Sequence, residues 1–492
     1  MKKFLILMIC FCSVFTFSAC KKKEDNLSEL SKNLTTYEIN LNIDCTTKNV
    51  TATQTVNYIN KSNNILKNIK FHLYPQFFKE GATNYIVSST KLNQAYPNGM
   101  SYSNFEINRI VVNNLDTSIV YEYELNSILS VELSNSLLPN ENVKIYFEYS
   151  FTLPNCQHRF GYGENTINLA NFYPIACVFE NGEFNTSPYN SNGDPFFSDM
   201  SNYCVNITAD NHYIAAGTGE KSINSSNEKT TTTQFNAKLV RDFALVLSNR
   251  FETISTQYEN TKIEYYFFDD KYADKSLQAG YDAIKTFSHL FGKYPYSTFS
   301  IVKTDFVYGG MEYPNLIMIS SDIDNLDDYL NVIIHETAHQ WWYGMVGNNE
   351  YEYPWLDEAL TEYSTILFYD NNTGYNLNHT NMVKNCRDNY SLFISVYEEV
   401  LGKIDTSMRS VNEYKTEPEY TYCTYIKGVL MYDSLYQLVG KDKFYKSLKQ
   451  YFLDNKYTNT TPEKLINTFE TVCKQDLTNF FNSWLLGKVV IR

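Results

Sequence analysis

The sequence has little glycine or proline, and it has no strongly basic region after its amino-terminal tail. Only 19 glycines and 12 prolines occur in 492 residues, which argues against a collagen-like or low-complexity disordered chain. The formal net charge is −14, so a nucleic-acid backbone is not an expected partner. A chain of this length can bury several hydrophobic cores, and two to four domains are expected.

The first 20 residues lack a hydrophobic run that could span a membrane. Lys2 and Lys3 precede sixteen uncharged residues, whereas a membrane span needs about 20. Residues 17–20, Phe-Ser-Ala-Cys, resemble the lipobox of bacterial lipoproteins, in which the cysteine becomes the lipidated first residue. Phe17 stands where leucine is usual, so an ordinary cleaved signal or an uncleaved anchor is the alternative. We expect a signal peptide over residues 1–19, lipidation at Cys20, and a polar tether over residues 20–35.

This amino terminus predicts an exported protein held at the cell membrane or cell surface by its lipid anchor. Ten cysteines occur, of which two leave with the signal and one carries the lipid. The remaining seven contain no Cys-x-x-Cys pair and are odd in number, so a full disulfide framework is not indicated, although one pair would fit an exported protein.

The hydrophobic pattern divides the chain into a strand-rich front and a helical back. Residues 143–151 alternate apolar and polar side chains, as do residues 69–73, and this period of two is typical of strands. Near residue 270 the spacing becomes helical, first up to Gly292 and later over residues 428–439 and 477–486. We expect a strand at residues 298–306 between helices. The fold class is therefore α+β and multidomain, with an all-β domain over residues 36–250 and a mostly helical domain over residues 251–492.

A short motif in the helical half carries metal-binding chemistry. Residues 335–339 read His-Glu-Thr-Ala-His, and positions i and i+4 share one face of a helix. His335 and His339 can therefore bind one Zn²⁺ together, and Glu336 can act as the general base for an attacking water. The other five histidines are scattered and are interpreted as structural or surface residues: His72, His158, His212, His289 and His379.

A catalytic zinc site needs a third protein ligand. The three-histidine motif would place another histidine at position 345, where Met345 stands, so that class is excluded. A helix opened by Pro354 offers a carboxylate instead, and Glu358 follows the second histidine after eighteen residues. Asp357 is the alternative ligand, and Glu362 lies one turn further along the helix.

With these residues the sequence resembles the gluzincin metalloaminopeptidases, the group of aminopeptidase N, over about residues 36–487. Three further segments are similar to motifs of that family. Residues 309–313, Gly-Gly-Met-Glu-Tyr, resemble its exopeptidase motif, and residues 425–428, Tyr-Ile-Lys-Gly, resemble its catalytic-tyrosine segment. Residues 240–244 resemble a segment near the end of its β-domain.

The resemblance implies a thermolysin-like catalytic domain with one Zn²⁺ per chain. It assigns the metal ligands to His335, His339 and Glu358, and the general base to Glu336. It implies that Tyr425 donates a hydrogen bond to the oxyanion of the reaction. Tyr420 and Tyr422, which lie nearby in the sequence, are the alternatives. It implies that Glu312, after Gly309, Gly310 and Met311, binds the free α-ammonium of the substrate, with the two glycines on an edge strand.

Several features depart from the family pattern or could not be aligned. Tyr313 and Ala359 replace a common asparagine and glycine of the family. Glu164 and Asn165 are the candidates for a second amine anchor from the β-domain. The sequence ends soon after residue 484, without the large helical domain of many relatives, and a more open cleft is therefore expected.

Together these features predict a zinc aminopeptidase that hydrolyses the amino-terminal bond of peptides with a free amino terminus. One alternative is an endopeptidase of the same zinc class, which the expected open cleft would permit. The other is a catalytically inactive surface protein that uses the scaffold for binding.

Overall fold

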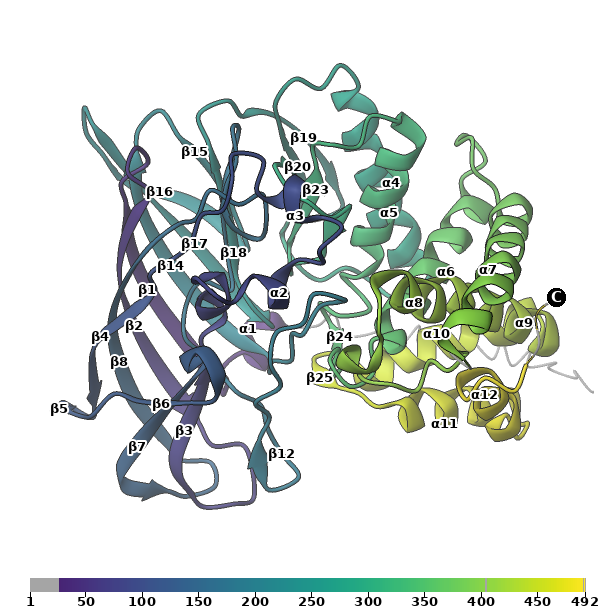
Figure 1. Ribbon diagram of the computed structural model, residues 1–492, viewed down its shortest axis with the longest axis horizontal. Helices are drawn as coiled ribbons and strands as arrows, with labels where there is room; N and C mark the ends of the chain where they lie inside the picture. Colours follow the sequence, from purple (N-terminus) through teal and green to yellow (C-terminus); the bar gives the residue numbers. More distant parts are fainter. Residues whose placement is uncertain (1–25, 403–404, 490, 492) are drawn as a thin grey trace, which may run out of the picture.

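The computed structural model describes residues 26–402, 405–489 and 491 (Figure 1). A strand-rich front part occupies one side of the molecule and a helical part the other. The expected signal peptide and Cys20 lie outside the described residues. Within the described residues, none of the helices has the length and apolar character that a membrane crossing requires.

The front part is built on an eight-stranded sheet. Its strands, in spatial order, are β16 (Glu220–Ser226), β17 (Thr230–Val240), β14 (Ser201–Asp210), β1 (Thr35–Ile43), β2 (Asn49–Ile59), β8 (Asn142–Thr152), β4 (Glu106–Val112) and β5 (Leu115–Asp116). On β8 buried and more exposed positions alternate, which confirms the period of two expected at residues 143–151.

Smaller sheets complete the front part. One contains β15 (Ile214–Gly217), β18 (Ala244–Ser248), β10 (Ile167–Ala170) and β9 (Phe160–Tyr162); another contains β11 (Ile175–Ala176), β3 (Leu66–His72), β7 (Ile128–Leu137) and β6 (Val120–Glu122); β12 (Phe179–Glu180) pairs with β13 (Glu183–Phe184). Its short helices are α1 (Leu27–Leu30), η1 (Tyr74–Phe78), α2 (Thr83–Ile86), α3 (Leu92–Ala95) and η2 (Glu124–Asn126).

The helical part begins with a five-stranded sheet on which two helices pack. The strands are β19 (Glu252–Tyr258), β20 (Thr261–Phe267), β21 (Thr298–Thr304), β23 (Leu316–Ser320) and the edge strand β22 (Gly310–Met311). The helices are α4 (Ala273–Leu290) and α5 (Leu326–Ala338). Asn325 caps α5 by accepting a hydrogen bond from the Asp328 amide, which fixes where the histidine-bearing helix starts.

The remaining elements form a helical layer beside this sheet. They are β24 (Val346–Gly347), α6 (Trp355–Asn371), α7 (His379–Leu401), η3 (Val411–Glu413), α8 (Glu417–Thr421), the π-helical turn η4 (Tyr422–Ile426), α9 (Lys427–Val439), α10 (Lys441–Asn455), β25 (Thr458–Asn459), α11 (Pro462–Cys473) and α12 (Thr478–Leu485). The helices expected over residues 428–439 and 477–486 are thus confirmed to within one residue. The large-scale expectation of a β-rich front and a helical back is also confirmed.

The strand expected at residues 298–306 is shorter than predicted, because Asp305 leaves the sheet direction to bind the front part. Its carboxylate accepts hydrogen bonds from the amides of Asn165 and Thr166 at 2.6 and 3.1 Å. The largest cluster of buried apolar residues continues across this junction from the β sheets into the helices. The two parts therefore share one core.

The described end of the expected tether is packed rather than solvated. Leu27 and Leu34 contact Met200 and Leu239 of the front part, together with Tyr457 of the helical part. Among the described residues the tether is therefore attached from α1 onward. Within the part of the chain that the structure describes, no disulfide bond joins the seven cysteines considered for pairing: Cys45, Cys156, Cys177, Cys204, Cys386, Cys423 and Cys473.

Candidate metal centre and active-site cleft

The three predicted metal ligands converge at one point between α5 and α6. The Nε2 atoms of His335 and His339 are 3.3 Å apart, and Glu358 Oε2 lies 3.5 and 3.2 Å from them. A tetrahedral ion with bonds of about 2.0–2.1 Å keeps its ligands about 3.3–3.4 Å apart, so the three atoms fit Zn²⁺. One ligand atom from each of these three residues lies within 4.8 Å of the other two, so they form a group that could hold a metal ion.

Outer contacts turn both histidines toward this point. His335 Nδ1 is 2.7 Å from Glu362 Oε2, and His339 Nδ1 is 2.9 Å from the carbonyl oxygen of Trp342. These partners leave the two Nε2 atoms directed inward, as in many metal sites. Glu362 was noticed in the sequence only as a residue one turn beyond the ligand, and its position here gives it an orienting role.

Asp357, the alternative ligand, faces a different neighbour. Its Oδ1 atom lies 3.3 Å from the side-chain nitrogen of Asn348. Burial raises the pKa of Asp357 to about 7, whereas the pKa of Glu358 is lowered to about 2 because the two histidines outweigh the effect of its own burial. The geometry and the charge therefore favour Glu358 as the third ligand.

Glu336 lies beside the histidines, and one oxygen of its carboxylate lacks a hydrogen-bond partner among the described residues. That oxygen, Oε2, is buried, and burial raises the pKa of Glu336 to about 7. A Cβ atom at Gly310 would lie 2.3 Å from Glu336 Oε1. The glycine of the edge strand is thus what allows the backbone of β22 to approach the candidate base so closely.

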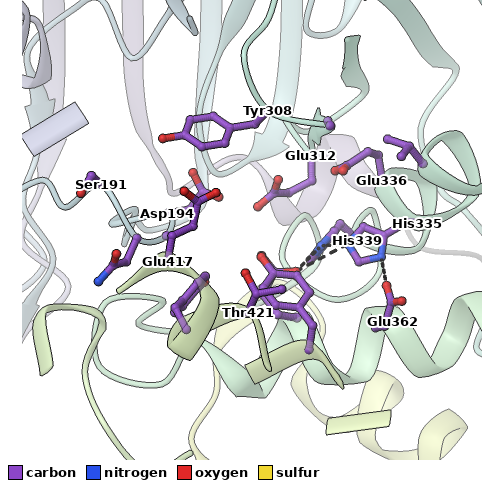
Figure 2. A pocket seen from close by; sticks show the side chains of 18 of the residues that line it. Ser191, Asp194, Tyr308, Glu312, His335, Glu336, His339, Glu362, Glu417 and Thr421 are labelled. Atoms are coloured by element: carbon purple, nitrogen blue, oxygen red, sulfur yellow. Dashed lines mark hydrogen bonds and ion pairs between the residues drawn. The ribbon is translucent and has the colours of Figure 1, made fainter. Parts of the chain in front are cut away.

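Figure 2 shows that Glu312 and Asp194 face the same cleft as Glu336 and the histidines. Glu312 is 3% exposed, its Oε1 atom has no hydrogen-bond partner among the described residues, and burial raises its pKa well above the usual range. One carboxylate oxygen from each of Asp194, Glu312 and Glu358 lies within 4.8 Å of the other two. This group forms an anionic corner next to the candidate metal site.

Contacts from the residue just after α5 hold the segment next to Glu312 in place. Gln340, just after the helix, donates to the carbonyl of Tyr313 at 3.1 Å and accepts from the amide of Asn315 at 2.8 Å. Tyr313 is fully buried and donates to Asn171 Oδ1 at 2.8 Å. Tyr313 therefore ties this segment to the front part.

The prediction of Glu164 or Asn165 as the second anchor is wrong. Neither residue lines the cleft, and Asn165 binds Asp305 through its amide and its side chain. The carboxylate that the front part contributes is Asp194, which forms an ion pair with the buried Arg159 at 2.5 Å. No spacing marked Asp194 in the sequence, because its loop meets Glu312 only through tertiary packing.

Tyr425 is the tyrosine nearest to the metal ligands among the three candidates. Its hydroxyl donates to Glu358 Oε1 at 2.5 Å. Tyr420 also lines the cleft, but its hydroxyl is packed against Gly193, where an added Cβ would lie 2.4 Å away. Tyr422 instead stacks on Phe393, with ring centroids 4.3 Å apart, so it points away from the site.

The cleft has a volume of about 350 Å³ and is rich in carboxylates. Glu417 lies at its wall, where Ser88 Oγ donates to it at 2.8 Å and Lys91 Nζ lies 3.4 Å away. These contacts join the front part to α8. The other five carboxylates that line the cleft are Asp194, Glu312, Glu336, Glu358 and Glu362.

A β-rich front joined to a helical part with this ligand set and base is typical of a metallopeptidase. Residues 276–484 match the model of the peptidase family M1 domain. Leucine aminopeptidase 2 of Ajellomyces capsulatus is 30% identical over 205 residues, which cover 40% of this chain and 30% of that protein. Aminopeptidase B of Mus musculus is 30% identical over 203 residues, which cover 38% and 29%. These matches span less than a third of the relatives' own length.

The likeness to a solved structure extends over nearly the whole chain. An M1 zinc metallopeptidase from Deinococcus radiodurans superposes with a TM-score of 0.64 and 15% identity over 93% of this chain and 95% of that one. At this identity the comparison establishes a shared fold. One structure of that protein, a point mutant, is bound to a Tyr-Ser-Ala substrate.

Proposed function

We propose that the protein is a zinc-dependent aminopeptidase that hydrolyses the first peptide bond of peptides with a free amino terminus. The observation that carries the proposal is that the carboxylates of Asp194 and Glu312 lie close to Glu358, the carboxylate among the candidate metal ligands. A buried carboxylate without a partner is costly, and an ammonium group is a partner that satisfies it by charge-assisted hydrogen bonds. The match to the peptidase family M1 domain and the similarity to proteins named leucine aminopeptidase 2 and aminopeptidase B support this proposal.

The site residues divide the reaction between them. His335, His339 and Glu358 would hold one Zn²⁺, which supplies Lewis-acid polarisation of the scissile carbonyl and lowers the pKa of water. Glu336 takes the proton from the attacking water and later delivers it to the nitrogen of the leaving amine. Burial raises the pKa of Glu336 to about 7, and a Zn²⁺ held by the neighbouring histidines would favour the carboxylate form that accepts the proton.

Three further side chains act on the substrate. Glu312 and Asp194 bind the α-ammonium, which places the first peptide bond, rather than an internal one, beside Glu336. Tyr425 donates its hydroxyl hydrogen bond to Glu358 in the free protein, and with substrate present it would donate to the carbonyl oxygen as negative charge develops there.

The deciding experiment uses one peptide with a free and with an acetylated amino terminus, and the protein from residue 26 onward, with and without a zinc chelator. Cleavage of the first bond of the free peptide alone, abolished by chelation and restored by Zn²⁺, is expected. Internal cleavage of both peptides would instead establish the endopeptidase alternative. Failure to cleave either peptide, with one zinc bound, would favour the inactive binding protein.

We further propose export and lipid anchoring through Cys20, which rest on the sequence of residues 1–20. The first packed element, α1, starts at Leu27. At no more than about 3.6 Å per residue, the seven steps from Cys20 reach about 25 Å. The enzyme would thus work close to the membrane surface. Fractionation of cells expressing the wild type and Cys20→Ala tests this: release of the variant supports the anchor, and equal membrane association removes it.

A further inference from the structure

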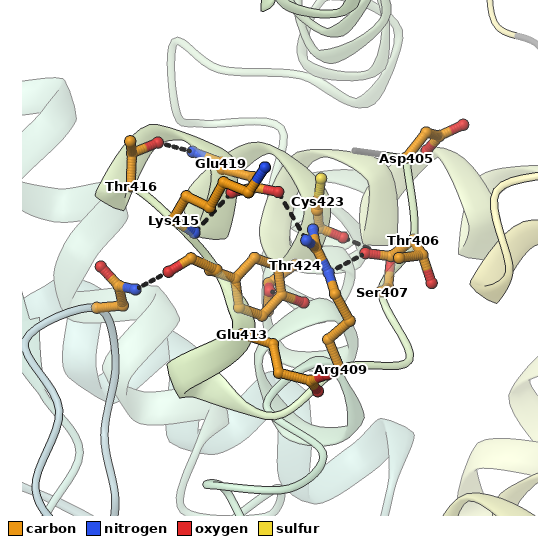
Figure 3. Close-up of polar contacts among 12 residues, drawn as sticks. Asp405, Thr406, Ser407, Arg409, Glu413, Lys415, Thr416, Glu419, Cys423 and Thr424 are labelled. Carbon is orange, nitrogen blue, oxygen red and sulfur yellow. Dashed lines mark hydrogen bonds and ion pairs between the residues drawn. The ribbon is translucent and has the colours of Figure 1, made fainter. Parts of the chain in front are cut away.

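A largely buried ion pair joins Arg409 to Glu419, six residues before Tyr425 (Figure 3). Arg409 Nη1 is 2.6 Å from Glu419 Oε1, and the side chain of Glu419 is fully buried. The second oxygen of Glu419 accepts a hydrogen bond from the backbone amide of Lys415 at 2.7 Å. Arg409 in turn donates through Nε to the carbonyl of Thr406 at 3.1 Å.

The segment needs such support because its backbone is irregular. Between residues 411 and 426 the chain forms a short 3₁₀ turn, one turn of α-helix and the π-helical turn η4. A π-helical turn disturbs the regular helical hydrogen bonds and is often found at functional sites. Ser407 Oγ donates at 2.6 Å to the carbonyl of Cys423, inside η4. The segment next to Arg409, through Ser407, thus supports the π-helical turn that carries Tyr425.

Aromatic contacts connect the ion pair to the catalytic hydroxyl. The guanidinium of Arg409 lies 4.1 Å from the ring centroid of Tyr414. Tyr414 packs edge-on against Tyr420, and Tyr420 packs edge-on against Tyr425, with centroid distances of 5.3 and 5.8 Å. The hydroxyl of Tyr425 then meets Glu358. Close-packed rings transmit a displacement at one end to the other, because the contacts leave no free volume to absorb it.

The same network reaches the loop with the amine anchor. Asn192 Nδ2 donates to the carbonyl of Tyr414 at 2.8 Å, and Gly193 fits against the hydroxyl of Tyr420. Asp194 follows directly. The ion pair therefore supports the oxyanion donor on one wall of the cleft and the loop of the front part on the other.

We propose that Arg409 and Glu419 are positioning residues for Tyr425, and that their charge and fork geometry set the place of its hydroxyl in the reacting complex. A buried ion pair is weak evidence of a stabilising role, because the cost of removing both charges from water offsets much of their attraction. A role in fixing geometry explains why both oxygens of Glu419 are used. The inference rests on the proposed aminopeptidase function.

The test is a double-mutant cycle between Glu419→Gln and Tyr425→Phe. Glu419→Gln is expected to lower kcat about 10-fold or more for a free-amine peptide, with KM changed less than about 3-fold, because a shift near 1 Å in a catalytic group can cost about 10²-fold. In the Tyr425→Phe background the same substitution should cause little further loss. Equal losses in both backgrounds would overturn the proposal and leave a purely structural pair.

Controls separate position from folding and from metal loss. Zinc content and the visible spectrum of the Co²⁺-substituted protein should match the wild type, since the ligands lie outside the ion pair. Asp116→Asn, which removes the acid of the exposed Arg109 pair, is the matched control and should leave kcat unchanged. If Glu419→Gln does not fold, Arg409→Lys tests the same pair, because lysine retains the charge but loses the planar guanidinium group. This substitution should lower kcat when Tyr425 is present and cause little further loss in the Tyr425→Phe background.

The two proposals fail in different ways. An inactive wild type that binds zinc would dismiss the aminopeptidase, whatever the variants do. An active wild type whose Glu419→Gln and Arg409→Lys variants retain full kcat would dismiss the positioning role alone.

Discussion

The two ends of the cleft differ in how the chain assembles them. At the metal end, His335, Glu336 and His339 come from the end of one helix, and Glu358 comes from the next. At the amine end, Glu312 directly follows an edge strand and Asp194 comes from a loop of the front part. The metal end thus depends on local helical spacing, whereas the amine end depends on packing between distant segments.

This difference has a functional consequence. The metal end supplies the hydrolytic chemistry, which any peptide bond could undergo. In the proposed function the amine end decides which bond is presented, and it is supported by longer-range contacts such as Gln340 to Tyr313 and Asn192 to Tyr414. Substitutions at the first end should therefore abolish turnover, and substitutions at the second should change selectivity.

The largest effect is expected for Glu336→Gln at the metal end. The amide keeps the shape but cannot accept the proton of water, so kcat should fall about 10³-fold or more. Zinc content, measured by atomic absorption, should stay at the wild-type level because Glu336 is not a ligand. Retention of substantial turnover would remove Glu336 as the base.

The next effect concerns the amine end and separates its two carboxylates. Glu312→Gln should lower kcat/KM for a free-amine peptide about 10- to 100-fold, since it weakens a charge-assisted hydrogen bond. Asp194→Asn should cost less on the same peptide, because the charge of Asp194 is shared with Arg159. Kinetics with free and acetylated peptides measure both effects.

Glu164→Gln is the matched control for this pair, because Glu164 is exposed and lies outside the cleft. Its kinetics should equal those of the wild type. If Glu312→Gln reduced cleavage of the free and acetylated peptides to the same extent, the amine-binding role would be lost and the contrast between the two ends with it.

A smaller effect on turnover is expected for Glu362→Gln. The carboxylate fixes His335 through Nδ1, and loss of such an outer contact typically weakens metal binding about 10- to 100-fold. Turnover should recover at saturating Zn²⁺, which a titration of activity against free zinc would reveal. Persistent loss of turnover at saturating metal would mean that Glu362 acts on the substrate instead.

The smallest effect tests the support behind the metal end. His379 on α7 binds Asp370 of α6 and Asp433 of α9, both at 2.9 Å, and these hydrogen bonds raise its pKa from 6.5 to about 9. Its contribution to stability is fully present below about pH 6.5 and is lost as the pH rises through about 9. His379→Gln should lower the Tm by about 2 °C at pH 6 and hardly at all at pH 10.

Thermal unfolding at both pH values measures this difference. His212→Gln is the control, because His212 also pairs with an aspartate but is exposed. A Tm loss for His379→Gln that is independent of pH would show that the charge of His379 contributes nothing.

The metal end could be predicted because its information is local in sequence. Two histidines at helical spacing and a carboxylate on the following helix were sufficient, and Pro354 marked where that helix starts. The front sheet was predictable for a similar reason, since burial on β8 follows the period of two. The sequence predicted β21 to end two residues too late, because Asp305 accepts hydrogen bonds from backbone amides about 140 positions earlier in the chain.

The amine end could be predicted only in part. Glu312 was found through the resemblance of its motif, and the close approach of Gly310 to Glu336 explains why glycine is needed there. Asp194 carries no comparable signal, since neither a period nor a motif connects residues 118 positions apart. Glu164 and Asn165 were chosen for their approximate region, and in the structure that region serves to anchor Asp305.

The contact between Gly428 and Ala359 gives the site a mechanical property. A Cβ at Gly428 would lie 2.2 Å from the Cβ of Ala359, so α6 and α9 have room for only one methyl group between them at this crossing. Ala359 is adjacent to Glu358, and Gly428 lies three residues after Tyr425. The backbones of α6 and α9 are therefore held at a fixed separation at this crossing, next to Glu358 on one side and just after the turn that carries Tyr425 on the other.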